Sequence, residues 1–178
     1  PGFSVIYGWF NFKEPPLDEK AVRQALMYAM DVDRINQIAT NGTYTRQCGP
    51  VFNDHWAYNP DINCYERDLD KARELLRGAG WEWDEEDRVW KKDGEELGFL
   101  YQTDYHWRSE PEVEVSARQF EELGVKVELD VRSWDVFWPE MQQGNITAAI
   151  GMGQTVMSAD QMMYRQFHSS MQPPNGWN

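Results

Sequence analysis

The sequence lacks several features that would assign it to a large class of proteins. It has no apolar run near the ~20 residues that a membrane-spanning helix needs. Basic residues are scarce, since 17 lysines and arginines stand against 30 aspartates and glutamates, for a net charge of −13. Nucleic acid and anionic lipid both bind basic surfaces. We therefore expect no nucleic acid as a partner and no direct insertion of this chain in a membrane.

Motifs for nucleotide binding, nucleophilic catalysis and metal binding are missing as well. The sequence contains no Gly-x-Gly-x-x-Gly, no P-loop and no Gly-x-Ser-x-Gly elbow, and Gly151-x-Gly153 is too short to count. The acidic run at 84–87 is typical of a solvated turn, whereas glycosidase carboxylates face each other across a cleft. With two cysteines, three separate histidines and no CxxC, a four-ligand zinc site is not indicated. We expect no enzyme activity, no cofactor and no metal.

The two cysteines, Cys48 and Cys64, leave one question open. In an oxidising compartment they can form a disulfide that closes the loop between them. Two independent thiols are an equally good interpretation from sequence alone.

What the chain does contain is material for a packed core. Its residues are 41% hydrophobic and 14% aromatic, which excludes disorder, and 178 residues suit one domain. Alternation and helical spacing predict strands that alternate with helices. The predicted strands are 3–12, 97–101, 125–131 and 146–150. The predicted helices follow Asp18, Asp31 and Asp68 or Asp70, and occupy 112–123, 134–143 and 160–167. This order predicts a layered α/β architecture without an internal linker.

Capping and turn residues predict where these elements begin and end. Asp18 and Asp31 are expected to cap the first two helices, and Asn41-Gly42 to end the second. Asp93-Gly94 predicts the turn of a hairpin over 88–100. Gly151-Met152-Gly153 is expected to form a loop after the last strand.

Several long stretches, in order, resemble one known family. They are NFKEPPLDEKAVRQALMYAMDVDRI (11–35), the loop NGTYTRQCGPVF that follows, YNPDINCYERDLDKARELLRGAGW (58–81) and QFEELGVKVEL. They resemble the extracytoplasmic solute-binding proteins of ABC importers, family 5, typified by dipeptide- and oligopeptide-binding proteins. Together they span nearly all of the chain, and the first and third are long enough to be specific.

The resemblance implies a periplasmic-binding-protein-like lobe of type II, cluster C, with a mixed sheet flanked by helices. Such proteins have two α/β lobes that close over the ligand, and residues 1–178 match only the second, C-terminal-side lobe. We therefore expect a truncated fragment that holds one wall of a binding site. Its start, Pro-Gly, is interpreted as processed or engineered. The parent is expected in the periplasm or at the cell surface, secreted or as a lipoprotein, delivering solute to ABC permease subunits.

The same resemblance implies a set of ligand contacts. They are Trp134, at the start of a short helix, and the segment after the next strand, Gly151, Met152, Gly153, Gln154 and Thr155. A flat aromatic ring offers a large contact area at low entropy cost, and glycine lets the backbone approach a ligand closely. Trp138, one turn after Trp134, is expected on the same face. Trp9 joins the candidates, although it could equally face the core.

Two positions depart from the peptide-binding pattern of the family. Peptide binders commonly have Trp after the first glycine of this segment and an acidic residue a few positions later, which pairs with the peptide amino group. Here those positions hold Met152 and Thr155. A buried amine without a counter-charge is costly, so we weigh an oligosaccharide beside an oligopeptide as the ligand. A sensor ectodomain and a glycan-active accessory domain are the alternatives to transport.

Overall fold

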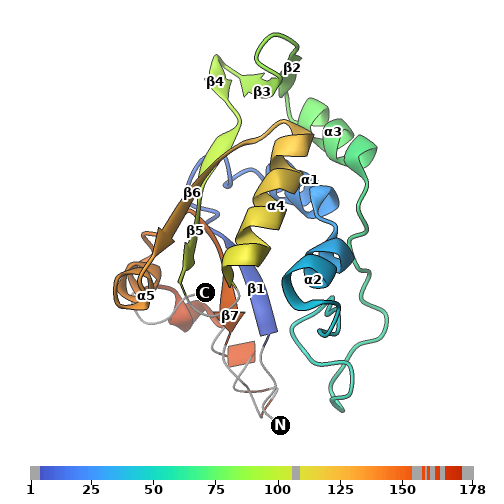
Figure 1. The fold of residues 1–178 in the computed structure, drawn as a ribbon, viewed down its shortest axis with the longest axis vertical. Coiled ribbons are helices and arrows are strands. Elements are labelled where there is room, and N and C mark those ends of the chain that lie inside the picture. Colours follow the sequence, from blue (N-terminus) through green and yellow to red (C-terminus); the bar gives the residue numbers. More distant parts are fainter. Residues whose placement is uncertain are drawn as a thin grey trace.

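The computed structural model describes residues 5–105, 109–153, 158, 160, 163–164 and 167–173. Its main sheet has four strands in the order β1-β7-β5-β6, and a smaller sheet has three in the order β2-β3-β4 (Figure 1). The strands are β1 (Val5–Phe10), β2 (Glu82–Asp84), β3 (Val89–Lys92), β4 (Glu95–Glu96), β5 (Gly98–Asp104), β6 (Lys126–Arg132) and β7 (Ala148–Gly153). The helices are α1 (Lys20–Ala29), α2 (Val32–Thr40), α3 (Leu69–Gly78), α4 (Ser109–Leu123) and α5 (Trp134–Gln143), with a 3₁₀ turn, η1, at Ser169–Met171.

The main sheet is mixed, as the resemblance implied. β5 runs parallel to both β6 and β7, whereas β1 is antiparallel to β7. The carboxyl ends of β5, β6 and β7 therefore lie at one edge of the sheet, together with the amino end of β1. The two parallel connections pass through α4 and α5. This is the mixed α/β architecture expected from the alternating elements.

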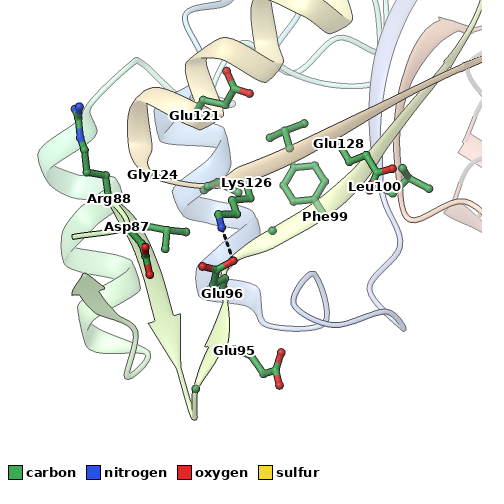
Figure 2. Close-up of a pocket in the computed structure, with 15 residues that line it drawn as sticks. Asp87, Arg88, Glu95, Glu96, Phe99, Leu100, Glu121, Gly124, Lys126 and Glu128 are labelled. Atoms are coloured by element: carbon green, nitrogen blue, oxygen red, sulfur yellow. Dashed lines mark hydrogen bonds and ion pairs between the residues drawn. The ribbon is translucent and has the colours of Figure 1, made fainter. Parts of the chain in front are cut away.

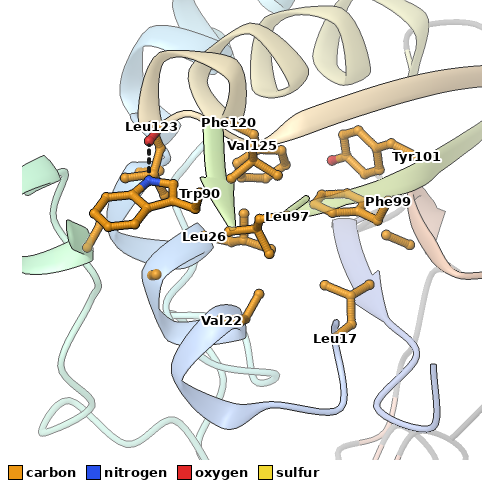
Figure 3. Close-up of a cluster of buried hydrophobic side chains, with 14 of the residues drawn as sticks. Leu17, Val22, Leu26, Trp90, Leu97, Phe99, Tyr101, Phe120, Leu123 and Val125 are labelled. Carbon is orange, nitrogen blue, oxygen red and sulfur yellow. Dashed lines mark hydrogen bonds between the residues drawn. The ribbon is translucent and has the colours of Figure 1, made fainter. Parts of the chain in front are cut away.

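The helices lie on both faces of the sheet. α1 and α4 cover one face, where Leu26 and Phe120 are fully buried with residues of β5 (Figure 3). α3, with the fully buried Leu76, packs against α1 and α4. Phe120 packs edge-on against Phe99 and at a tilt against Tyr101, with ring centroids 5.8 and 5.7 Å away. α2 packs against α4. α5 covers the opposite face, so the chain forms a three-layer unit around the sheet (Figure 1).

The small sheet β2-β3-β4 stands at the amino ends of β5 and β6 and is joined to the main unit by packing and an ion pair. The buried indole N–H of Trp90 donates to the carbonyl of Leu123 at 2.8 Å. Lys126 of β6 pairs with Glu96 of β4 at 2.5 Å (Figure 2). Asp93 and Gly94 both have positive φ, as the predicted Asp-Gly turn requires.

Most predicted caps are confirmed and one is wrong. Asp31 and Asp68 accept from the N–H groups of Arg34 and Lys71, and Asn41 ends α2 in the left-handed region. Asp18 is not the cap of the first helix, because α1 begins later, with Glu19 at its N-cap position. No side-chain hydrogen bond caps α1, and the carboxylate of Glu19 instead binds Lys92.

Two strand predictions need correction. The strand after the Asp93-Gly94 turn does not stay in the hairpin, since only Glu95–Glu96 pairs with β3 and β5 then enters the main sheet. Gly151-Met152-Gly153 is not a loop but the last part of β7, because β1 continues to pair with it. Half of the predicted helix at 160–167 falls outside the described residues.

The structure answers the question of the cysteines in favour of the bond. Cys48 and Cys64 form a disulfide with their Cα atoms 5.0 Å apart. It closes a long loop between α2 and α3, which is also held by Arg46, whose guanidinium donates to the carbonyl of Tyr65 and pairs with Glu66. The loop thus has a fixed path although it contains no regular secondary structure.

Candidate ligand-binding site

The carboxyl edge of the parallel strands carries the candidate site. In open α/β sheets ligands bind outside the carboxyl ends of the strands. Trp134 begins α5 only two residues after β6 ends, so the chain path alone places it at this edge. Gly153 pairs with Val5 at the end of β7 and lies at the same edge. The predicted contacts from two distant parts of the sequence are therefore brought to one side of the sheet.

Trp134 and Trp138 form a stacked pair on α5. Their ring centroids are 5.0 Å apart and their planes differ by 16°. Trp134 is 43% exposed, whereas Trp138 packs partly against a small apolar cluster under α5. That cluster is Phe137, Met141, Ile146 and Ala149. The inner indole is thus fixed by packing, and the outer one extends the same flat surface toward solvent.

Trp9 packs against the same apolar cluster from β1. A Cβ added to Gly151 would lie 3.4 Å from the Trp9 ring, so the indole sits directly over the glycine backbone. Trp9, Gly151 and Trp138 therefore lie beside the same apolar cluster. The half-buried Trp9 supports the surface that the two stacked indoles form. The predicted contacts Gln154 and Thr155 lie outside the described residues.

Polar residues at the ends of β5 and β6 were not among the predicted contacts. Gln102, 1% exposed, accepts from the Thr147 N–H at 2.9 Å and donates to Asp130 at 3.3 Å. Asp130 pairs with Arg132 at 2.5 Å, and this hydrogen bond raises the pKa of the Arg132 guanidinium further above its ordinary value. Asp104, 2% exposed, stands opposite Arg132 in the strand register. The edge therefore offers fixed charge beside the stacked indoles.

A sequence signal for these polar residues existed. Gln102-Thr103-Asp104 follows directly on the apolar run Phe99-Leu100-Tyr101, and buried polar side chains at the end of a strand indicate a site. Thr103 is instead structural, since its hydroxyl donates to the carbonyl of Ile150 at 2.9 Å and ties β5 to β7.

The described residues offer no sign of a metal centre or a membrane span. No group of three His, Cys, Asp or Glu among them could hold a metal ion. None of the described helices is both long enough and apolar enough to cross a bilayer.

Comparisons with known proteins identify relatives of this chain. A family model, "Bacterial extracellular solute-binding proteins, family 5 Middle", matches residues 1–173. Heme-binding protein A of Haemophilus influenzae is 30% identical over 84% of the chain, and oligopeptide-binding protein AppA of Bacillus subtilis is 28% identical over 94%. The chain spans only 26% and 31% of the length of these two relatives.

Solved structures share the fold. AppA in complex with a nonapeptide superposes with a TM-score of 0.83 at 25% identity, over 97% of this chain and 35% of that one. An oligopeptide-binding protein of Thermotoga maritima with bound mannohexaose gives 0.81 at 15% identity, over 96% and 33%. The family match over almost the whole chain, together with the type II binding-protein fold, shows that the chain belongs to the bacterial extracellular solute-binding proteins of family 5.

Proposed function

We propose that the protein of which this chain is one lobe captures a solute outside the cytoplasm and delivers it to an ABC permease. The observation that carries the proposal is the half-exposed Trp134–Trp138 stack at the carboxyl edge of β5, β6 and β7. The exposed indole of this surface suits ligand contact, and the relatives of the chain are solute-binding proteins, so binding without turnover is the expected activity. Residues 1–178 act as the second lobe, and ligand is enclosed when the first lobe closes on them.

An oligopeptide is the leading ligand class. The relatives matched over most of the chain include an oligopeptide-binding protein, and AppA takes a nonapeptide in its solved structure. Arg132 and its neighbouring carboxylates provide charge near the candidate site that a zwitterionic peptide can use. Flat indoles pack against peptide side chains and peptide planes alike.

An oligosaccharide is the second candidate, favoured by two observations. Thr155 stands where peptide binders of the family commonly have an acidic residue. The outer face of Trp134 is exposed, and sugar rings bind well against flat indole faces.

Calorimetry on a protein that contains both lobes separates these classes. Di- and oligopeptides with free amino termini are titrated beside oligosaccharides, with the Trp134→Ala variant in parallel. Trp56→Ala is the matched control, because Trp56 is 90% exposed on the disulfide-closed loop, away from α5. Heat from one ligand class that is lost in Trp134→Ala and kept in Trp56→Ala supports the proposal. Turnover of a peptide or glycoside, or no binding of either class, contradicts it.

A further inference from the structure

A groove of about 970 Å³ lies at the opposite edge of the sheet from the candidate ligand site. Its walls come from the turn of the small sheet, the amino ends of β5 and β6 and the end of α4 (Figure 2). Gly98 lines this groove at the start of β5. A Cβ there would lie 2.9 Å from the carbonyl oxygen of Lys126, so only glycine lets the two strands begin this close together. Capture of a solute at the carboxyl edge makes no use of this groove.

Lys126, Val127 and Glu128 of the groove lining belong to β6, which is the last strand of the main sheet. Among the described strands β6 pairs only with β5. The N–H of Lys126 donates to Leu97 and the carbonyl of Arg132 accepts from Tyr105, so these residues turn their peptide groups toward β5. Because peptide groups alternate in direction along a strand, those of Val127, Leu129 and Val131 point outward. Such an edge is a template for an added strand.

The charges around the groove indicate which kind of segment can bind beside β6. Two of its carboxylates are already paired, Asp87 with Lys91 and Glu96 with Lys126, each at 2.5 Å. Three more have no ion-pair partner among the described residues, and they come from three different elements: Glu95 of β4, Glu121 of α4 and Glu128 of β6. Figure 2 shows them spread around the groove. Arg88 is the single lining cation without a described partner, so the unpaired charge is negative by two.

A second copy of this chain does not suit the edge. Antiparallel pairing of two β6 strands over all seven residues centres on Leu129. That register places Lys126 opposite Arg132 and Glu128 opposite Asp130, so like charges meet at each of these positions. Like charges directly across a strand pair are destabilising. The net charge of −13 adds long-range repulsion between copies.

We propose that the β6 edge and its groove bind an extended basic segment of a partner protein, which adds as a strand beside β6. Its backbone pairs with the outward peptide groups of Val127 and Leu129. Its lysine or arginine side chains reach Glu95, Glu121 and Glu128. The interaction is independent of the solute, because the groove lies at the amino ends of β5 and β6 and the candidate ligand site lies at their carboxyl ends.

The test uses a fluorescently labelled peptide of about eight residues, the length of an ordinary strand, in which Lys alternates with Thr or Val. Anisotropy should show binding that weakens with salt, and the same peptide with Glu in place of Lys should not bind. Changing Glu95, Glu121 and Glu128 together to Gln should weaken the Lys peptide roughly tenfold, because each exposed ion pair contributes a factor of roughly two to three. The control is a triple neutralisation of exposed carboxylates outside the groove, Glu14→Gln, Asp54→Asn and Asp61→Asn.

Backbone pairing has its own readout. Leu129→Pro removes one outward N–H at a position where an edge strand tolerates proline, and should abolish binding, whereas Leu129→Ala should keep it. Amide exchange at Val127 and Leu129 should slow in the complex. All titrations are repeated with Trp134→Ala, which removes binding in the solute cleft and should leave the affinity unchanged. Equal affinity in the groove and control triples, loss of binding with Trp134→Ala, or β6-dependent dimerisation in sedimentation would each overturn the proposal.

Discussion

Trp134 and Trp138 lie one turn apart on α5 with their indole planes 16° from parallel and their centroids 5.0 Å apart. The outer ring is the more exposed of the two, because Trp138 packs against the cluster that also contacts Trp9. We therefore expect the two tryptophans to have different roles. Packing against this cluster fixes Trp138 and with it the stack, and contact of the exposed Trp134 ring with a ligand is the prediction.

This division predicts different effects for the two truncations. Trp138→Ala should lower the free energy of unfolding by about 2 kcal/mol, less than the ~3–5 kcal/mol typical of a fully buried aromatic residue. Trp134→Ala should change it by less than about 0.5 kcal/mol, as for an ordinary surface site. Urea unfolding followed by circular dichroism measures both. Equal losses in the two variants would show that both rings are packing residues.

The disulfide should stabilise the loop between α2 and α3. Replacing Cys48 and Cys64 by Ala removes a crosslink between residues 16 apart, and the chain-entropy model puts its contribution at about 3 kcal/mol. Thermal unfolding of wild type and double variant, each with and without reductant, measures the effect. Reductant should lower the wild-type midpoint toward that of the variant and leave the variant unchanged. A wild type that is indifferent to reductant would contradict a stabilising role.

Two glycines should respond to alanine with opposite signs. Gly124 has φ +95° and an added Cβ would meet the Trp83 ring at 2.2 Å, so Gly124→Ala should destabilise the junction of α4 and β6 by more than about 1 kcal/mol. Gly78, within α3, has open space around its Cα, and Gly78→Ala should stabilise by about 0.4–1 kcal/mol. Chemical unfolding of both variants checks the signs. A stabilised Gly124→Ala would refute the contact with Trp83.

The small sheet should weaken in acid through Asp84. The Asp87 N–H and then the Lys91 ammonium hydrogen-bond its carboxylate, which lowers its pKa below the ordinary 3.8. The contribution to stability is therefore complete above pH 3.8 and is lost as the pH falls through the lowered folded-state pKa. A carboxyl NMR titration of Asp84, with Asp84→Asn as the control for the acid unfolding curve, tests this. A midpoint at or above 3.8 would contradict the assignment.

The sequence predicted those elements whose signals are local. The Asp31 cap, the Asp93-Gly94 turn and the α5 range follow from side chains within a few residues of each boundary, and all three are confirmed. The errors arose where pairing with a strand distant in the sequence determines the local structure. Gly151–Gly153 has the composition of a loop, and it becomes strand only because β1, far away in the sequence, pairs with it.

The candidate site shows the same division. Family resemblance pointed to Trp134, whose contact with ligand stays a prediction, and helical spacing pointed to Trp138. The chain of contacts from Gln102 through Asp130 to Arg132 joins side chains 28 residues apart along a strand pair, and only the parallel register brings them together. Periodicity within one segment carries no information on that register.

Binding of solute at Trp134 is tested most directly by calorimetry on the two-lobed protein and on residues 1–178 alone, each with and without Trp134→Ala. We expect an oligopeptide or oligosaccharide to bind the two-lobed protein, the variant to bind at least roughly tenfold more weakly, as for an aromatic contact residue at the centre of a site, and the single lobe to bind far more weakly than the whole. Unchanged affinity in the two-lobed Trp134→Ala variant, or equal affinity of the single lobe and the whole protein, would contradict the account.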